Sequence, residues 1–207
     1  MKHARVLLLV GGASYHDQPE HREILSSLFS SKFETTMADN AQVLTSENLG
    51  HYDAIADYTS WWEPSEEQHK AVLGAVRAGL GYFCMHPATA SFLNDAEHIA
   101  MVGGLFIDHD PNKVFVVNIP TARHVEKHPI TQGIGDFPIQ DELFVVDGDQ
   151  TQWHIIARAE GHPVLWCKDW GQGRVHTNVL GHDGRALNNP SLQTLILNGV
   201  EWVAGLR

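Results

Sequence analysis

Near its start the chain carries the segment RVLLLVGG, residues 5–12, in which five consecutive apolar residues are followed by two glycines. A short unbroken run of branched apolar side chains is typical of a strand buried on both faces, as in a parallel sheet covered by helices. The glycines allow the backbone to turn sharply and to approach a ligand closely. The segment therefore predicts an α/β fold whose first strand is buried and ends in a loop that could serve a site.

The residues that follow alternate between predicted strands and helices. Pro19 suits the first turn of one helix, Ser65 is placed to cap another, and Gly79 ends that second helix. The predicted elements are a strand at 5–10, a helix at 20–29, strands at 33–37 and 52–57, a helix from 65 to about 78, and a strand at 82–85. This alternation favours an open, mainly parallel sheet with helices on both faces, of the flavodoxin-like kind.

The second half of the chain is richer in strands. Branched and apolar residues predict strands at 114–119, 142–146, 155–158, 164–167 and 174–180, followed by an amphipathic helix at 191–204. The segment KDWGQG, residues 168–173, predicts a turn that adds an antiparallel hairpin to the sheet. No linker, repeat or low-complexity tract divides the sequence, so we expect a single domain over residues 1–207.

Composition narrows the classes of partner. The chain has 207 residues, with 14 Lys and Arg against 25 Asp and Glu, which gives a formal net charge of −11. Such a surface repels phosphate groups, so we expect no nucleic-acid partner and no anionic membrane. No apolar stretch approaches the roughly 20 residues of a membrane span, and the first apolar run is too short for a signal peptide. We expect a cytoplasmic protein in which Cys84 and Cys167 are buried free thiols.

Histidine is as frequent as lysine and arginine together, with 14 residues. It is the commonest metal ligand and the side chain best suited to move protons near neutral pH. Ligands of open parallel sheets bind beyond the carboxyl ends of the strands, and three of the four predicted strand exits carry a histidine. These histidines are His16, His86 and His182, and the fourth exit carries Trp61 and Trp62. We therefore predict a shared functional cluster at this edge of the sheet.

Two more segments contribute candidates. His109 lies in GGLFIDHD, residues 103–110, a predicted loop dense in ligand-type side chains. Asp141 and Glu142 directly precede a predicted strand and would place a carboxylate pair near the sheet edge. The ten other histidines show no shared pattern.

Each candidate also has an ordinary structural interpretation. His86 could be a core histidine bonded to a backbone carbonyl, and His182 could simply end a strand. His16 with Asp17 could form a turn before a helix, and the carboxylates could be solvated surface groups. The two tryptophans could be packing residues of a lid rather than a platform on which a sugar ring stacks.

Several well-known motifs are missing. The sequence contains no His-Glu-x-x-His and no Cys-x-x-Cys pair, so a metal site would have to be assembled from distant loops. It has no Walker phosphate loop, and Gly11-Gly12 lacks the rest of the dinucleotide fingerprint, so we expect no nucleotide cofactor. It also has no Gly-x-Ser-x-Gly nucleophile elbow.

Over nearly its whole length the chain resembles the ThuA-like family, which is named for trehalose utilisation. The resemblance rests on the order and spacing of several blocks, which are GG at 11–12 with HD at 16–17, GLGYFCMH at 79–86, GGLF at 103–106 with His109, HPIT at 128–131, DEL at 141–143, PVLW at 163–166, GQGRV at 171–175 and LGHD at 180–183. It implies a fold similar to class I glutamine amidotransferases, in which a cysteine lies on a tight turn after a central strand. Here His86 reaches that turn and Cys84 lies inside the strand, so glutamine hydrolysis is disfavoured. The family's association with sugar catabolism, often beside oxidoreductases that make 3-keto sugars, implies a small carbohydrate ligand.

Together these features predict an enzyme that acts on a sugar or 3-keto-sugar derivative by isomerisation, elimination or hydrolysis. A keto group acidifies the neighbouring C–H, and abstraction of that proton needs a base and stabilisation of the enediolate oxygen. The candidate acid–base residues are His86, His182, Glu142 and Asp141. A divalent metal ion such as zinc could be held by some of His16, His109 and His182. The candidate substrate contacts are Gly12, Tyr15, Trp61, Trp62 and Thr89.

Two other functions are compatible with the sequence. The chain could be a non-catalytic carbohydrate-binding or regulatory module on an amidotransferase-like fold without the nucleophilic cysteine. It could also be a structural protein with an oligomer interface, because edge strands of the second half could pair across a homodimer. Histidines that lie far apart or point into the core would weaken both site hypotheses together.

Overall fold

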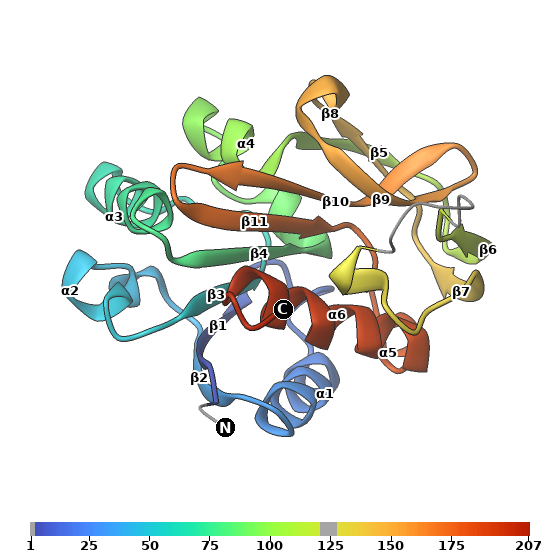
Figure 1. Cartoon of the computed structure of the whole chain (residues 1–207), viewed down its shortest axis with the longest axis horizontal. Coiled ribbons are helices and arrows are strands. Elements are labelled where there is room, and N and C mark those ends of the chain that lie inside the picture. The colour runs from blue at the N-terminus through green and yellow to red at the C-terminus, as the bar shows by residue number, and fades with distance from the viewer. Residues whose placement is uncertain (1–2, 121–127) are drawn as a thin grey trace.

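A computed structural model of the chain describes residues 3–120 and 128–207. Within these residues nine strands form one sheet, in the order β2-β1-β3-β4-β11-β10-β9-β6-β7, and β5 pairs separately with β8. Figure 1 shows the sheet running through the molecule with helices packed around it. The strands are β1 (Arg5–Gly11), β2 (Glu34–Ala38), β3 (Ala54–Thr59), β4 (Gly81–Met85), β5 (Leu105–His109), β6 (Lys113–Asn118), β7 (Phe137–Asp141), β8 (Phe144–Asp147), β9 (His154–Ala159), β10 (His162–Trp170) and β11 (Gly173–Asn178). The α-helices are α1 (Pro19–Ser30), α2 (Ser46–Leu49), α3 (Glu66–Arg77), α4 (Ala96–Val102), α5 (Gly184–Leu187) and α6 (Pro190–Val203).

One half of the sheet is parallel. β2, β1, β3, β4 and β11 lie side by side and point the same way, so all five end at one edge, and we call them the parallel half. β1 can occupy an inner position because its residues from Val6 onward are buried on both faces. β11 comes last of the strands along the described chain, yet it lies at the centre of the sheet between β4 and β10.

β10, β9, β6 and β7 run antiparallel to their neighbours, and we call them the antiparallel half. In a flat sheet β7 would lie about 19 Å from β11, because neighbouring strands are about 4.8 Å apart. Instead, the Asp141 carboxylate at the end of β7 accepts a hydrogen bond of 2.7 Å from the amide of Gly181, just beyond β11. The antiparallel half therefore curls, and its edge strand returns to the exit of β11.

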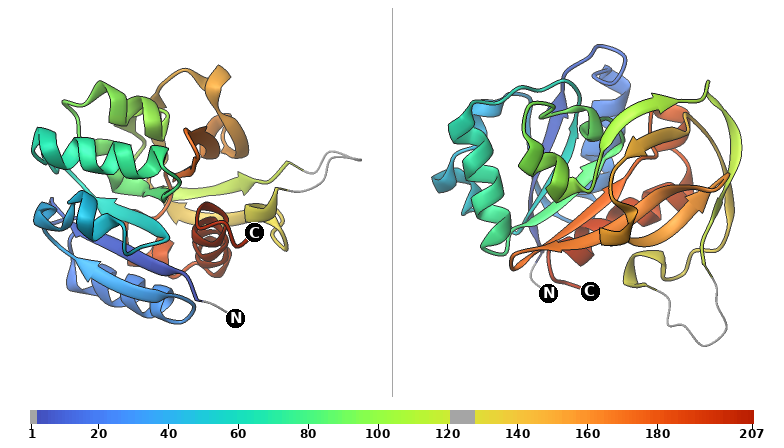
Figure 2. Two further views of the ribbon diagram at one scale, coloured as in Figure 1. Left: turned by 60° about the vertical axis from the view of Figure 1, so that its left-hand side comes forward. Right: turned by 90° about the horizontal axis from the view of Figure 1, so that it is seen from above.

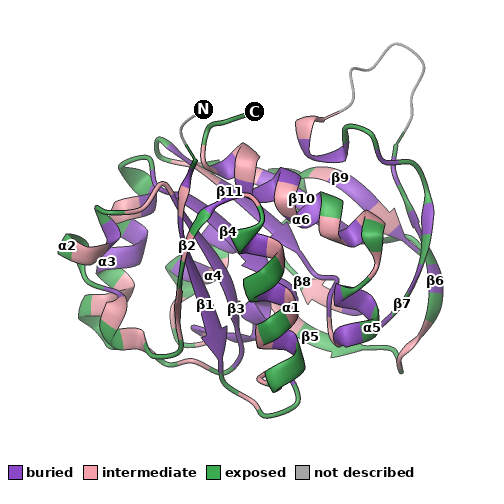
Figure 3. Ribbon diagram, turned by 90° about the horizontal axis from the view of Figure 1, so that it is seen from below, coloured by how far each residue is buried: buried purple, intermediate pink, exposed green. Residues whose placement is uncertain are grey.

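The helices cover both faces of the parallel half and create two cores. Val6, Leu8 and Val10 of β1 pack in one core with residues of α1 and α6, whereas Leu7 and Leu9 pack in the other with residues of α3 and α4. The left view of Figure 2 separates α3 and α4 from α1 and α6, which lie on the opposite side of the sheet. Figure 3 shows α1 and α6 in front of the buried strands of the parallel half, with α5 to one side near β7. No helix among the described residues is long and apolar enough to cross a membrane.

The predicted fold class is confirmed: the core of the sheet is parallel, helices cover both faces, and the hairpin of β10 and β11 is present. The antiparallel part is larger than predicted, because it also contains β9, β6 and β7. The predicted strand at 142–146 is β8, which begins at Phe144, and Asp141 ends β7 instead of preceding a strand. β7 contains Pro138, which an edge strand tolerates because proline has no N–H to donate. The predicted loop around His109 is strand β5.

Candidate functional site

Three histidines converge at the carboxyl edge of the parallel half. His16 lies in the loop after β1, His86 begins a 3₁₀ helix (His86–Ala90) after β4, and His182 follows β11. Their ring centroids are 5.3 Å apart for His16 and His86, 5.0 Å for His16 and His182, and 5.4 Å for His86 and His182. One nitrogen from each ring lies within 4.8 Å of the other two, a spacing that a single metal ion could bridge. We call His16, His86 and His182 the histidine triad.

His86 is fully buried and held in one orientation. Its Nδ1 lies 2.8 Å from the carbonyl oxygen of Val179, and a carbonyl can only accept, so Nδ1 carries the proton. Nε2 then has a free lone pair, and this buried atom has no hydrogen-bond partner among the described residues. The ring centroids of Phe144 and His86 lie 3.8 Å apart, so the Phe144 ring leaves no room for water on that side of His86. A buried acceptor without a partner is costly, and a ligand would relieve that cost.

His16 is positioned by its backbone. Gly12 has φ +106°, and a Cβ there would lie 1.8 Å from the carbonyl oxygen of Ser60, so only glycine fits this turn. The next amide, of Ala13, donates to Ser60 Oγ at 3.0 Å, and Nδ1 of His21 donates to the His16 carbonyl at 2.8 Å. The His16 ring then places Nε2 at 3.1 Å from Nδ1 of His182, while its own Nδ1 is buried without a partner among the described residues.

His182 meets both another histidine and a carboxylate. Its Nδ1 lies 3.1 Å from His16 Nε2 and 3.1 Å from Oε2 of Glu142. Its backbone is held by Asp141, whose Oδ1 accepts from the His182 amide at 3.0 Å, and by Tyr58, whose hydroxyl donates to the Gly181 carbonyl at 2.8 Å. Of the triad, His182 is thus the member with a charged neighbour.

Burial keeps the triad neutral. It lowers the pKa of His16 to about 3, with further lowering from the nearby His182. Burial also holds the pKa of His86 well below its ordinary value, and lowers that of His182 although the Glu142 carboxylate opposes the shift. Near pH 7 all three are therefore neutral imidazoles, which is the form that binds metal ions.

The acidic pair divides into a buried and a partly exposed member. Asp141 is fully buried, and its burial raises its pKa to about 7 although three backbone N–H groups donate to it. The Glu142 side chain remains 15 % exposed and directs Oε2 to His182. The two adjacent carboxylates thus have different surroundings, and only Glu142 faces the triad.

His109 lies at the rim of the site rather than in the triad. It ends β5 in the small two-stranded sheet, its side chain is 41 % exposed, and its Nδ1 lies 3.6 Å from Glu142 Oε2. The group that could hold a metal contains His86 in its place. β5 lies in the separate two-stranded sheet with β8, so the direction of the parallel strands does not place His109 among the three histidines that meet at their ends.

Two of the five predicted substrate contacts form an exposed aromatic pair. Tyr15 and Trp61 are 52 % and 48 % exposed, and Trp61 Nε1 donates to the Tyr15 hydroxyl at 2.8 Å. The Tyr15 ring also contacts that of His16, with centroids 4.7 Å apart. Trp61 has φ +59°, a left-handed conformation that is strained for a bulky residue and that recurs at ligand sites. Of the other predicted contacts, Gly12 is exposed and packs on Ser60, Trp62 is half-buried over Gly11, and the buried Thr89 donates its hydroxyl to the His86 carbonyl.

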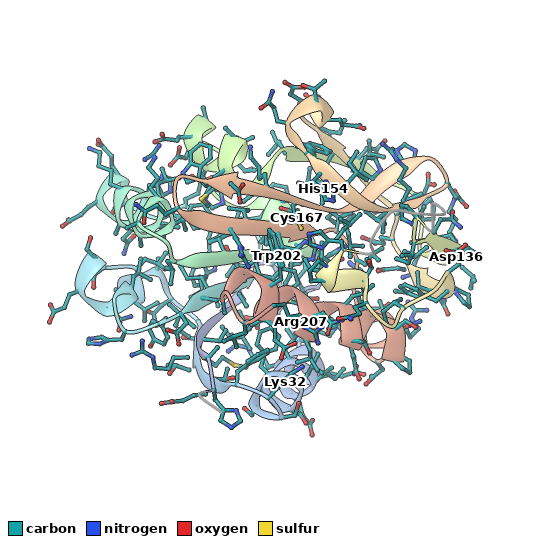
Figure 4. The ribbon with its side chains drawn as sticks, viewed as in Figure 1. Lys32, Asp136, His154, Cys167, Trp202 and Arg207 are labelled. Carbon is teal, nitrogen blue, oxygen red and sulfur yellow. The ribbon has the colours of Figure 1, made fainter. Side chains whose placement is uncertain are left out.

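Neither cysteine is placed as a nucleophile. Cys84 is fully buried within β4, where burial raises its pKa well above the ordinary value. The exit of β4 is a regular 3₁₀ turn rather than a strained elbow, since His86 is not among the described residues with positive φ. Cys167 is buried on β10, where it borders a cavity of about 260 Å³ with His154 and Trp202; Figure 4 labels these three.

A larger cavity, of about 560 Å³, lies at the opposite edge of the sheet. It is lined by residues that precede β3 and β4, such as Asp53 and Leu80, and by small residues of α3. Its lining contains no histidine. Ligands of parallel sheets bind at the carboxyl edge, and the chemistry-bearing side chains gather there, so we place the candidate site at the triad.

Sequence reasoning missed two residues that hold the site. Tyr58 is buried in β3, and a buried tyrosine hydroxyl needs a polar partner, so its position directly before the loop of Trp61 was an available signal. His21 is buried near the start of α1, where its ring donates to the His16 carbonyl. Its place in the first turn of the predicted helix, close to the loop after the first strand, was the available signal. His124 lies outside the described residues.

Comparisons with known proteins agree with this picture. The profile of the ThuA family, described as trehalose utilisation, matches residues 5–203. No curated protein matches the chain. Among solved structures, a protein from Parabacteroides merdae described as ThuA-like is 19% identical, with a TM-score of 0.81 over 98% of this chain and 90% of that one. A cytoplasmic protein from Salmonella typhimurium LT2 is 15% identical, with a TM-score of 0.68 over 98% of both chains.

The fold is also similar to that of a protein from Thermoplasma acidophilum that is described as part of a GMP synthase. That protein is 13% identical, with a TM-score of 0.60 over 99% of this chain and 96% of its own. At this identity the likeness concerns the fold alone.

Proposed function

This chain belongs to the ThuA family, the trehalose utilisation family, and from that premise we propose that it is an enzyme of sugar metabolism that acts on a sugar or 3-keto-sugar derivative at the histidine triad. The observation that carries the proposal is the set of three neutral imidazoles, of which His16 and His86 are buried and His182 is half-buried, each with one nitrogen within 4.8 Å of the others. Two of these rings have a buried nitrogen without a partner among the described residues.

The residues of the triad suit a divalent metal ion such as zinc. Catalytic zinc sites use three protein ligands, commonly histidines at about 2.0–2.1 Å, and leave a fourth position open. Two nitrogens bound to one tetrahedral zinc lie about 3.4 Å apart, and His16 Nε2 lies 3.1 Å from His182 Nδ1. A metal ion held there would act as a Lewis acid on a substrate oxygen. We assign the fully buried His86 to this ligand set instead of to proton transfer.

Proton transfer then falls to Glu142. Its carboxylate is partly exposed, next to His182, and within 3.6 Å of His109 at the rim. In a 3-keto sugar the C–H beside the carbonyl is acidic enough for a carboxylate to remove its proton when the enediolate oxygen is stabilised. His109 can take that proton from Glu142 on the solvent side, because it is the most exposed residue of the group.

The carbohydrate would lie against the Tyr15–Trp61 pair. Aromatic faces contact the apolar C–H face of sugar rings, and this pair is exposed beside His16. We expect Gly12 and Trp62 to shape the wall of the site, since Trp62 packs over Gly11. The buried hydroxyl of Thr89 is already engaged, so we propose no contact of Thr89 with the substrate.

The test combines metal analysis with turnover. We expect the purified chain to hold about one zinc or other divalent ion per molecule and to turn over members of a panel of 3-keto glycosides until a chelator removes the metal. His86→Ala should lose both metal and turnover. Full activity of His86→Ala, or of the metal-free chain, would contradict the proposal.

A second candidate function is supported by one observation, the exposed Tyr15–Trp61 pair. A non-catalytic carbohydrate-binding or regulatory module would need this pair and not the triad. Calorimetry distinguishes the two: sugar binding without turnover and without sensitivity to chelator favours the module.

We extend the proposal to location and partners. A cytoplasmic protein with a small carbohydrate ligand, without nucleic acid, fits the net charge of −11. Pairing of the edge strand β7 across a homodimer stays a prediction, and light scattering would test it.

A further inference from the structure

The peptide segment Gly181-His182 is held at all four of its polar backbone atoms. The two amides donate to the carboxylate of Asp141, at 2.7 Å for Gly181 and 3.0 Å for His182. The two carbonyls lie at 2.8 and 3.3 Å from the hydroxyl of Tyr58. Gly181 has φ +112°, which places these groups in a conformation that a side chain would resist. Asp141 and Tyr58 thus form a clamp on the segment that carries His182.

We infer that Asp141 and Tyr58 are positioning residues of the site, which fix the contact between His182 and Glu142 on which the proposed function rests. Asp141 acts on both partners of that contact. Its Oδ1 accepts from the amide of Glu142 at 2.9 Å as well as from that of His182. One buried carboxylate therefore sets the backbones of two residues whose side chains meet at 3.1 Å.

The clamp joins the two halves of the sheet. Asp141 ends the edge strand of the antiparallel half, whereas Tyr58 lies on β3 of the parallel half. Both side chains are fully buried, so each hydrogen bond forms without competition from water. Both bonds from Asp141 to the β11 exit join strands that are not neighbours in the sheet, so the clamp fixes the place where the two halves meet beside His182.

The molecule contains a matched control on the other face of the sheet. Asp57 and Tyr82 are also fully buried, and the Tyr82 hydroxyl donates to Asp57 Oδ2 at 2.6 Å. Asp57 accepts in addition from the amide and hydroxyl of Thr59, and neither member contacts the triad. Substitutions in this pair remove comparable buried hydrogen bonds without touching His182.

The first experiment measures zinc affinity by competition calorimetry for the wild type and four variants. Changes to residues that hold a metal ligand from behind typically cost 10–100-fold in affinity. We expect that loss for Asp141→Asn and Tyr58→Phe, and less than threefold for Asp57→Asn and Tyr82→Phe. If the visible bands of the Co²⁺-loaded protein shift in Tyr58→Phe but not in Tyr82→Phe, the geometry of the metal ligands has changed, as the inference expects. Equal losses in both pairs, or none in the clamp variants, would overturn the inference.

A second experiment needs no metal and separates this inference from the proposed function. Hydrogen exchange of the metal-free chain reports the amides of Gly181 and His182, which the clamp protects. We expect exchange at these amides to accelerate at least tenfold in Asp141→Asn and to stay unchanged in Asp57→Asn. If the wild type binds no zinc but this difference is found, the metal site fails and the clamp stands. If the exchange rates of the Gly181 and His182 amides are the same as in the wild type in both Asp141→Asn and Tyr58→Phe, the clamp is rejected.

Discussion

The two halves of the sheet supply different chemistry by different means. The parallel half supplies the histidine triad, and its members come together because parallel strands end at one edge, even though His16 and His182 are 166 residues apart. The antiparallel half supplies Asp141 and Glu142, which reach the same place only because that half curls back on itself. Strand direction alone therefore predicts where the histidines lie, whereas the carboxylates depend on the long-range shape of the sheet. Substitutions that remove one contribution at a time separate the two halves.

The largest effect is expected from the parallel half. His86→Ala removes a buried ligand, so zinc affinity should fall by more than 100-fold, beyond the 10–100-fold typical of residues behind the ligands. Metal content by mass spectrometry and turnover should be lost together. His176→Ala is the matched control, because His176 is equally buried on β11 and donates to the Trp166 carbonyl away from the triad. Equal losses of metal in the two variants would show that His86 acts only through stability.

The antiparallel half is tested by Glu142→Gln. This change keeps the shape of the side chain but removes its charge and its ability to accept a proton. We expect turnover to fall by about 10²–10⁴-fold, the usual contribution of a positioned acid or base, while zinc affinity changes less than tenfold. A comparable fall in zinc affinity would place Glu142 among the metal ligands and not at the proton-transfer step.

Asp57 is a buried aspartate of the parallel half that lies outside the site, in contrast to Asp141. Burial raises its pKa to about 6, so the folded chain holds this proton more tightly than the unfolded chain, whose value is near 3.8. Protonated Asp57 therefore adds to the free energy of unfolding below about pH 4, and this contribution is lost as the pH rises to about 6. The loss amounts to about 3 kcal/mol, since one pKa unit corresponds to about 1.36 kcal/mol. Asp57→Asn should flatten this part of the pH–stability curve in urea titrations. A parallel curve in the variant would contradict the assignment.

The smallest effect concerns Trp61. Loss of an aromatic contact costs about 0.5–1.5 kcal/mol, so Trp61→Ala and Trp61→Gly should each weaken sugar binding by about 3–10-fold in calorimetry. Trp61→Gly should unfold at a higher temperature than Trp61→Ala, because glycine adopts φ +59° without strain. Trp170→Ala, at a ring that packs under Arg77, is the control and should leave sugar affinity unchanged.

The sequence predicted the fold and the meeting of three histidines because both follow from local rules. An unbroken apolar strand at 5–10 indicated a parallel sheet, and residues after its strands had to share one edge. The sequence predicted a loop at His109 and named it among the possible metal ligands, whereas His109 ends the short strand β5 of a separate sheet, which nothing local distinguishes from a loop. The contacts of Asp141 with Gly181 and His182 could not be predicted either, because these partners are 40 and 41 residues away and depend on how the antiparallel half curls.

The central place of β11 has a consequence for how the protein is made. The ribosome makes β1–β4 and then β5–β10 before it makes β11, so the two parts of the sheet that flank β11 cannot be joined through it until β11 has been made. β11 must then insert between β4 and β10, and it brings with it His182 and the amides that bind Asp141. The candidate site therefore cannot be complete before the central strand of the sheet is in place. We expect chains that end before Gly173 to bind no zinc at concentrations that saturate the full chain, because they lack both β11 and His182.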